Sequence, residues 1–97
     1  SHHLENCIYL HYKRLGYSVY VGTIYNNEVD FVLEKDGIRE YVQVCYLLAD
    51  ETIINREYRS LEKIKDSYKK VVLSMDDVSF GNRNGIEHLC VWDMLSE

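Results

Sequence analysis

Polar and reactive side chains recur at every second position in two neighbouring β-rich segments: Glu28, Asp30, Gln43 and Cys45. Carboxylate and amide oxygens are the ligands that a hard cation such as Mg²⁺ prefers, and an ionised thiol is a nucleophile. Asp36-Gly37 separates the two segments. This dipeptide is a strong hairpin signal, because a type I′ turn needs positive φ at both central positions.

A two-residue loop also predicts the register of the hairpin. Lys35 faces Ile38, and counting outward sets Asp30 opposite Gln43 and Glu28 opposite Cys45. Side chains alternate between the two faces of a strand, so the apolar residues fall on the other face: Val29, Phe31, Val42 and Val44. The sequence therefore predicts one polar patch on a sheet that is otherwise apolar.

The bulk composition bounds the class of protein. Ninety-seven residues predict a single domain over 1–97 with one core. The net charge of −5, from 16 acidic and 11 basic side chains, disfavours a dedicated nucleic-acid-binding module. Three widely spaced cysteines without a Cys-x-x-Cys pair argue against a disulfide framework and a zinc knuckle. With no apolar run that could cross a bilayer, these features predict a cytoplasmic protein.

The chain begins with Ser1-His2-His3 rather than Met, and a helical pattern starts almost at once. Either an initiator Met was trimmed, or the chain is a fragment that carries residues of a tag. The absence of any lead-in to the helix favours the fragment, with Ser1–His3 as candidate tag residues.

Hydrophobic periodicity and turn residues predict the order αβββαβ(β)α. The helix between the third and fourth strands implies a crossover to a parallel neighbour, and hence a mixed sheet with a helix on each face. His11 lies in the apolar face of the first helix, where a packed, hydrogen-bonded histidine is expected. The predicted elements are helices over 4–15, from Asp50 or Thr52 to about Tyr68, and over 92–95, with strands over 17–23, 28–35, 38–46, 71–74 and 86–91.

Several short motifs, taken together, carry a family resemblance that spans nearly the whole chain. They are Leu4-Glu5-Asn6, Arg14-Leu-Gly-Tyr17, Val19-Tyr-Val-Gly22, Glu28-Val-Asp30-Phe31, Gln43-Val-Cys45-Tyr46, Ala49-Asp50-Glu51, Arg56-Glu57 and Lys63-Ile-Lys-Asp66. With the αβββαβ order, the chain resembles the PD-(D/E)XK nuclease superfamily and its restriction-endonuclease-like fold. More narrowly, it resembles the C-terminal domain of predicted bacterial and archaeal AAA+-type ATPases, a domain of uncharacterised function.

The resemblance implies a Mg²⁺ site in active members. Asp30 and the residue at Gln43 would hold the metal, with the carbonyl of Val44 and the helix carboxylate, here Glu5. A lysine two residues after the second ligand would polarise the attacking water. This chain has an uncharged amide at Gln43 and a thiol, Cys45, in place of the lysine.

Loss of a positioned charged group typically costs about 10²–10⁴ in rate, which makes hydrolysis the minority expectation. Asp30, Gln43 and Cys45 are therefore expected to be a vestigial catalytic motif, and Glu5, Asp30 and Gln43 a weak metal site. Another basic residue can take the place of the missing lysine, and Arg56 and Arg59 are nearest in sequence.

Each of these residues also has a purely structural interpretation. Asp30 and Gln43 can satisfy each other as a facing polar pair, and Cys45 can be a small buried hydrophobic residue. Glu28 can be a solvated carboxylate at a strand end, and Glu5 a first-turn acid favoured by the helix dipole. The basic stripe on the second helix, Arg56, Arg59 and Lys63, is most often a solvated face.

The expectation from sequence is a degenerate nuclease-fold domain that acts as an interaction or regulatory module of an ATP-binding protein. Its partners would be an upstream ATPase domain of the same polypeptide and an unknown protein. The alternative is a divalent-metal-dependent DNA endonuclease. A third possibility, a domain that binds nucleic acid without cutting it, is disfavoured by the net charge of −5.

Overall fold

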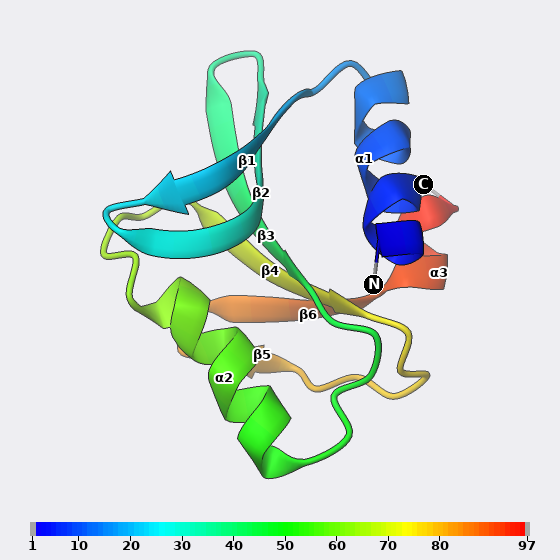
Figure 1. Cartoon of the computed structure of the whole chain (residues 1–97), viewed down its shortest axis with the longest axis vertical. Coiled ribbons are helices and arrows are strands. Elements are labelled where there is room, and N and C mark those ends of the chain that lie inside the picture. Colours follow the sequence, from blue (N-terminus) through cyan, green and yellow to red (C-terminus); the bar gives the residue numbers. More distant parts are fainter. Residues whose placement is uncertain (1, 97) are drawn as a thin grey trace.

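The computed structural model describes residues 2–96, so the expectation that Ser1 belongs to a tag lies outside the described residues. Three helices and six strands follow the predicted order, with one additional short strand, β5 (Figure 1). The helices are α1 (His2–Arg14), α2 (Glu51–Glu62) and α3 (Val91–Leu95). The strands are β1 (Ser18–Ile24), β2 (Asn27–Lys35), β3 (Ile38–Val44), β4 (Lys69–Ser74), β5 (Asn82–Arg83) and β6 (Ile86–Cys90).

The strands form one mixed sheet in the order β1-β2-β3-β4-β6-β5. β1, β2 and β3 pair antiparallel, whereas β3, β4 and β6 are parallel to one another. The predicted parallel crossover through α2 is confirmed, because β4 lies directly beside β3. The carboxyl ends of three parallel strands therefore meet at one edge of the sheet.

The helices cover the two faces of the sheet unequally. α1 and α3 lie together on one face and α2 lies on the other, as Figure 1 shows. Each face has its own apolar cluster, so the predicted arrangement with a helix on each face is confirmed. On the α1 side the cluster is centred on Ile8, Phe31, Leu33, Val42, Leu73 and Met94. On the α2 side it is centred on Val29, Tyr41, Tyr58, Leu61, Val72 and Ile86.

The predicted hairpin forms with the predicted turn. Asp36 and Gly37 have φ values of +54° and +78°, and Lys35 pairs with Ile38. Positive φ at both central positions is what a type I′ turn requires. The register holds from there to the pair of Phe31 and Val42.

A β-bulge then changes the pattern along β2. Tyr20 pairs with Val32 but Gly22 pairs with Val29, so β2 carries one extra residue between these pairs. A bulge reverses the alternation of side chains beyond it. The prediction that Val29 shares a face with Phe31 is therefore wrong, because Val29 packs in the α2-side cluster.

The second helix begins as predicted and ends early. The Asp50 side chain accepts a hydrogen bond from the amide of Ile53 at 2.9 Å, which confirms Asp50 as the N-cap. The helix ends at Glu62, six residues before Tyr68. The Asp66 carboxylate accepts hydrogen bonds from the Tyr68 amide and from Lys70 Nζ, and this local bonding replaces another helical turn.

Two further features concern the helices. His11 is buried as expected, but its Nε2 atom has no hydrogen-bond partner among residues 2–96, so the expected hydrogen bond is missing at that atom. None of the helices in the described part of the chain is long and apolar enough to span a membrane.

Candidate functional site

Asp30 and Gln43 do meet, directly after the last regular pair of β2 and β3, where Asp30 lies within the bulge. The Asp30 amide donates to Gln43 Oε1 at 3.2 Å, and the Val44 amide donates to Asp30 Oδ2 at 2.8 Å. These side chains thus replace the backbone hydrogen bonds of the ladder, whose last regular pair is Phe31 with Val42. The predicted proximity is confirmed, and the two side chains clamp the strands together.

A buried carboxylate on α2 completes the polar surroundings of Asp30. Burial raises the pKa of Asp30, the hydrogen bond from the Val44 amide opposes this, and the charges of Glu5 and Glu57 add to the rise. The charge of Glu5, on α1, thus acts on Asp30. Glu57, on the helix of the opposite face, is only 8% exposed, and its charge also acts on Asp30.

Glu57 was not among the candidate residues predicted from the sequence, although a signal for it exists. On α2 it lies three residues after Ile54 and four before Leu61, and so it occupies a position of the buried helical face. A carboxylate at such a position is seldom fully buried unless it has a partner or a function. Arg56 Nε lies 3.3 Å from Glu57 Oε2.

Cys45 directly follows β3 and lies on the α2 side of the sheet. Its amide bonds the carbonyl of Leu73 at 2.9 Å, and its thiol donates to the carbonyl of Leu47 at 3.1 Å. Burial raises the pKa of the thiol, and the charge of Glu57 raises it further. A thiol that is held protonated is a poor nucleophile, so this environment favours the structural role of Cys45.

Of the two basic residues considered as substitutes for the missing lysine, Arg56 acts on Cys45. Its positive charge lowers the pKa of the thiol in part, against the larger effects of burial and Glu57. Glu28, by contrast, is exposed and pairs with Thr23 of β1. The structure thus joins Asp30 to Gln43 by a hydrogen bond, and the charge of Glu57 acts on both Asp30 and Cys45.

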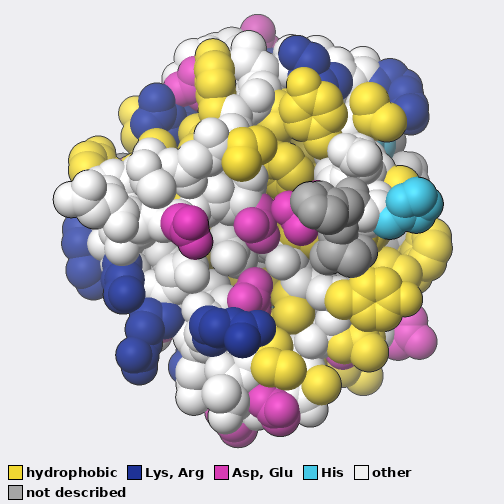
Figure 2. All heavy atoms as spheres, in the orientation of Figure 1, with side chains coloured by type: hydrophobic (Ala, Val, Ile, Leu, Met, Phe, Trp, Pro, Cys, Tyr) yellow, Lys and Arg dark blue, Asp and Glu magenta, His cyan; other side chains and the backbone are white. Residues whose placement is uncertain are grey.

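We call Asp30, Gln43, Cys45 and Glu57 the polar site. It lies where the first parallel strand, β3, ends, and open α/β sheets bind ligands at the carboxyl ends of their parallel strands. On the face of the molecule that Figure 2 shows, acidic side chains gather near the middle, between α1 and α2. Within residues 2–96, however, no three His, Cys, Asp or Glu side chains lie close enough to hold a metal ion. The donor set therefore suits a tightly bound cation poorly.

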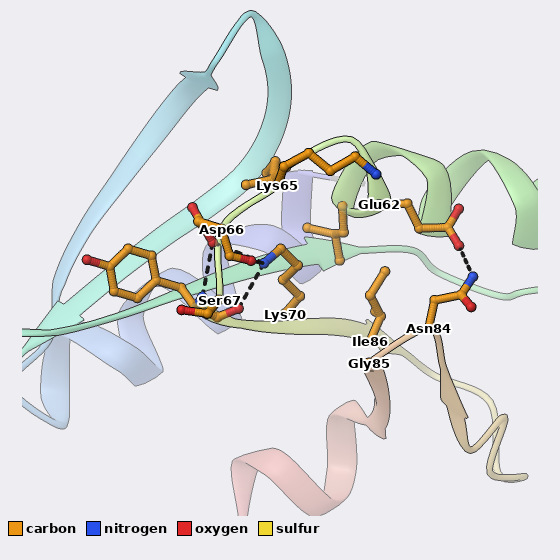
Figure 3. Close-up of a pocket in the computed structure, with 11 residues that line it drawn as sticks. Glu62, Lys65, Asp66, Ser67, Lys70, Asn84, Gly85 and Ile86 are labelled. Carbon is orange, nitrogen blue, oxygen red and sulfur yellow. Dashed lines mark hydrogen bonds and ion pairs between the residues drawn. The ribbon is translucent and has the colours of Figure 1, made fainter.

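A separate cleft of about 720 Å³ lies between the end of α2, the start of β4 and the turn before β6 (Figure 3). Lys70 Nζ, on its wall, donates to the Asp66 carboxylate at 3.0 Å and to the carbonyls of Asp66 and Tyr68. All three protons of the ammonium are thus used within the fold. None of the residues that line this cleft belongs to the polar site.

Comparison with known proteins shows a long match to an uncharacterised protein. No family model matches the chain. An uncharacterised protein of Haemophilus influenzae is 35% identical over 95 residues, which cover 98% of this chain and 23% of that protein. The chain thus spans less than a quarter of the length of this relative.

We expect weak binding of duplex DNA at physiological salt, with a dissociation constant no tighter than about 10⁻⁵ M. Phosphates would make contact at an exposed basic stripe, formed by Arg56 and Arg59 on α2 and by Lys63, the C-cap of this helix. Replacing all three by serine should abolish any residual binding in a fluorescence-anisotropy titration. Lys13→Ser with Arg14→Ser, on the exposed end of α1, is the control and should have little effect. Tight binding that is insensitive to salt would contradict this expectation.

Proposed function

We propose that this chain is a degenerate nuclease-fold domain that acts as an interaction or regulatory module of a longer, ATP-binding protein. The element order and the mixed sheet, with α1 and α2 on opposite faces, support a restriction-endonuclease-like core. The length of the Haemophilus influenzae relative, more than four times the matched part, supports a role as one module of a larger polypeptide.

One observation carries the proposal: the groups that would bind metal in a nuclease are engaged in holding the strands together. Gln43 Oε1 accepts from the Asp30 amide, and Asp30 Oδ2 accepts from the Val44 amide. The lysine position holds Cys45, whose thiol is protonated at neutral pH because burial and Glu57 raise its pKa. Without a cation at that position, the site lacks the group that would polarise a water molecule.

The alternative, a divalent-metal-dependent DNA endonuclease, has two observations in its favour. Asp30 has two further carboxylates near it, Glu5 and Glu57, and Arg56 brings a positive charge toward Cys45. Mg²⁺ binds through one or two carboxylates and retains several waters, so Asp30, Glu5 and Gln43 would hold it weakly. In that case Arg56 would take the place of the missing lysine.

We expect no DNA cleavage by the domain in Mg²⁺ or Mn²⁺. The assay is nicking and linearisation of supercoiled plasmid, with Asp30→Ala as the comparison. Wild type and variant should be indistinguishable. Metal-dependent cleavage by the wild type that is lost in both Asp30→Ala and Arg56→Ala would overturn the proposal and establish the endonuclease.

The module role has its own readout in the longer protein. Deletion of this domain should change the rate of ATP hydrolysis or the set of bound partners. Asp30→Asn should leave both unchanged, because an amide oxygen still accepts the hydrogen bond of the Val44 amide. A catalytic carboxylate would not tolerate this substitution.

A further inference from the structure

A continuous network of hydrogen bonds joins the two loops that follow β3 and β4, at the carboxyl ends of these strands. The Leu48 amide donates to Asp76 Oδ2 at 2.8 Å, and Ser74 Oγ lies 2.7 Å from the same carboxylate oxygen. Ser74 Oγ also lies 2.7 Å from His88 Nε2, and the Phe80 amide donates to His88 Nδ1 at 3.4 Å. Leu48 belongs to the loop after β3, and Phe80 to the loop after β4.

The donors in this network determine the tautomer of His88. A backbone amide can only donate, so Nδ1 of His88 accepts from Phe80 and carries no proton. The ring proton is then on Nε2, which donates to Ser74 Oγ, and the Ser74 hydroxyl donates to Asp76. Every member is satisfied with His88 neutral.

This arrangement does not constitute a catalytic triad. The Ser74 proton points to Asp76 rather than to His88, so the imidazole cannot act as the general base of the serine. Ser74 is also completely buried.

The surroundings of His88 favour the neutral ring. His88 is 7% exposed, and burial lowers its pKa below the ordinary 6.5, while the charge of Asp76 raises it in part. The elements around β6 carry other titratable or charged groups, but Asp76 is the one that shifts the pKa of His88. These other groups include Glu57 and Tyr58 on the buried face of α2, Lys70 on β4, Arg83 on β5, and Glu87 and Cys90 on β6 itself.

We propose that protonation of His88 at Nδ1 opens the loop after β4. Phe80 is released from His88, whereas Leu48, Asp76 and Ser74 stay hydrogen-bonded to one another. A proton on Nδ1 would face the proton of the Phe80 amide, and two donors cannot bond. The Nε2 side is unaffected, because that nitrogen already donates. The two loops therefore respond differently to the same proton.

Release of Phe80 would also change the surface of the molecule. The Phe80 ring now packs edge-to-face on the His88 ring, with centroids 4.9 Å apart, and against the α2-side cluster. Val78, two residues earlier, is already 64% exposed. Opening of this loop would expose the Phe80 ring next to Val78, and so enlarge the apolar surface there.

The test follows the Phe80 amide, the Leu48 amide and the His88 ring by NMR as the pH falls from 7.5 to 4.5, roughly the range that brackets an ordinary histidine pKa. We expect the protection factor of the Phe80 amide to fall by about tenfold or more as His88 titrates, while that of Leu48 stays within about twofold. His88→Gln, which can accept from Phe80 and donate to Ser74 but cannot take up a proton, should keep Phe80 protected throughout.

Asp76→Asn separates the electrostatic contribution. Because Asp76 raises the pKa of His88, its neutral replacement should move the opening of Phe80 to lower pH. Three results would each overturn the proposal. His88 titrates while the protection of the Phe80 amide does not change, Leu48 and Phe80 lose protection together, or the loop opens in the same way in His88→Gln.

Discussion

Replacement of Lys70 by methionine is expected to lower the free energy of unfolding by about 3 kcal/mol, the scale for breaking a buried ion pair by removing one partner. Lys70 is 9% exposed, and it donates to the Asp66 carboxylate and to the carbonyls of Asp66 and Tyr68. Methionine keeps most of the volume of the side chain but leaves these oxygens without their donor. Urea-induced unfolding followed by circular dichroism measures the difference.

The matched control is Lys69→Met on the same strand, because Lys69 is exposed. It should change the free energy of unfolding by less than about 0.5 kcal/mol. Equal effects of the two substitutions would show that the bonds of Lys70 contribute little.

The pH dependence of the Lys70 effect gives a second check. Burial alone would raise the pKa of Asp66, but hydrogen bonds from the Tyr41 hydroxyl and Lys70 outweigh it and hold the pKa below the ordinary 3.8. A carboxyl group with a lowered folded pKa stabilises the fold above its unfolded pKa, and this stabilisation is lost as the pH falls through the folded pKa. Lys70→Met should therefore weaken the acid dependence of stability.

The largest expected effect on activity comes from restoring the nuclease pattern with Gln43→Glu and Cys45→Lys together. The new carboxylate would add charge beside Asp30, and the new ammonium would lie near Glu57, whose charge already acts on Cys45. A positioned charged group is worth about 10²–10⁴ in rate, so Mg²⁺-dependent nicking of plasmid should rise from undetectable to measurable.

Gln43→Glu with Cys45→Met is the control, because methionine provides a long side chain without the charge. It should remain inactive. Thermal unfolding of both variants shows whether a lysine at position 45 is tolerated beside the α2-side cluster. A folded double variant that binds Mg²⁺ and does not cleave would argue against a nuclease ancestry of the polar site.

Local chemistry in the sequence determined much of this fold. Asp36-Gly37 specified the turn and hence the hairpin register from Lys35 to Phe31, since positive φ at two adjacent positions is a local property of these residues. Asp50 specified the start of α2 through its own side chain. The order of helices and strands followed from hydrophobic periodicity. The helix between the third and fourth strands then implied a crossover, and hence a parallel neighbour, which is β4 beside β3.

The composition of the polar site depended on contacts that only the tertiary structure creates. The bulge in β2 arises from its pairing with β1, and it moved Val29 to the opposite face while Asp30 and Gln43 took over the missing ladder bonds. Glu57 joined the site because α2 packs across the sheet.

The hydrogen-bond network through His88 likewise joins residues up to forty positions apart, from Leu48 to His88. Its side-chain members, Ser74, Asp76 and His88, are common polar residues without a local motif, and each becomes significant only because burial removes water as a partner. A buried polar group must find its partner within the fold, and that choice is made by packing over long sequence distances rather than by neighbouring residues.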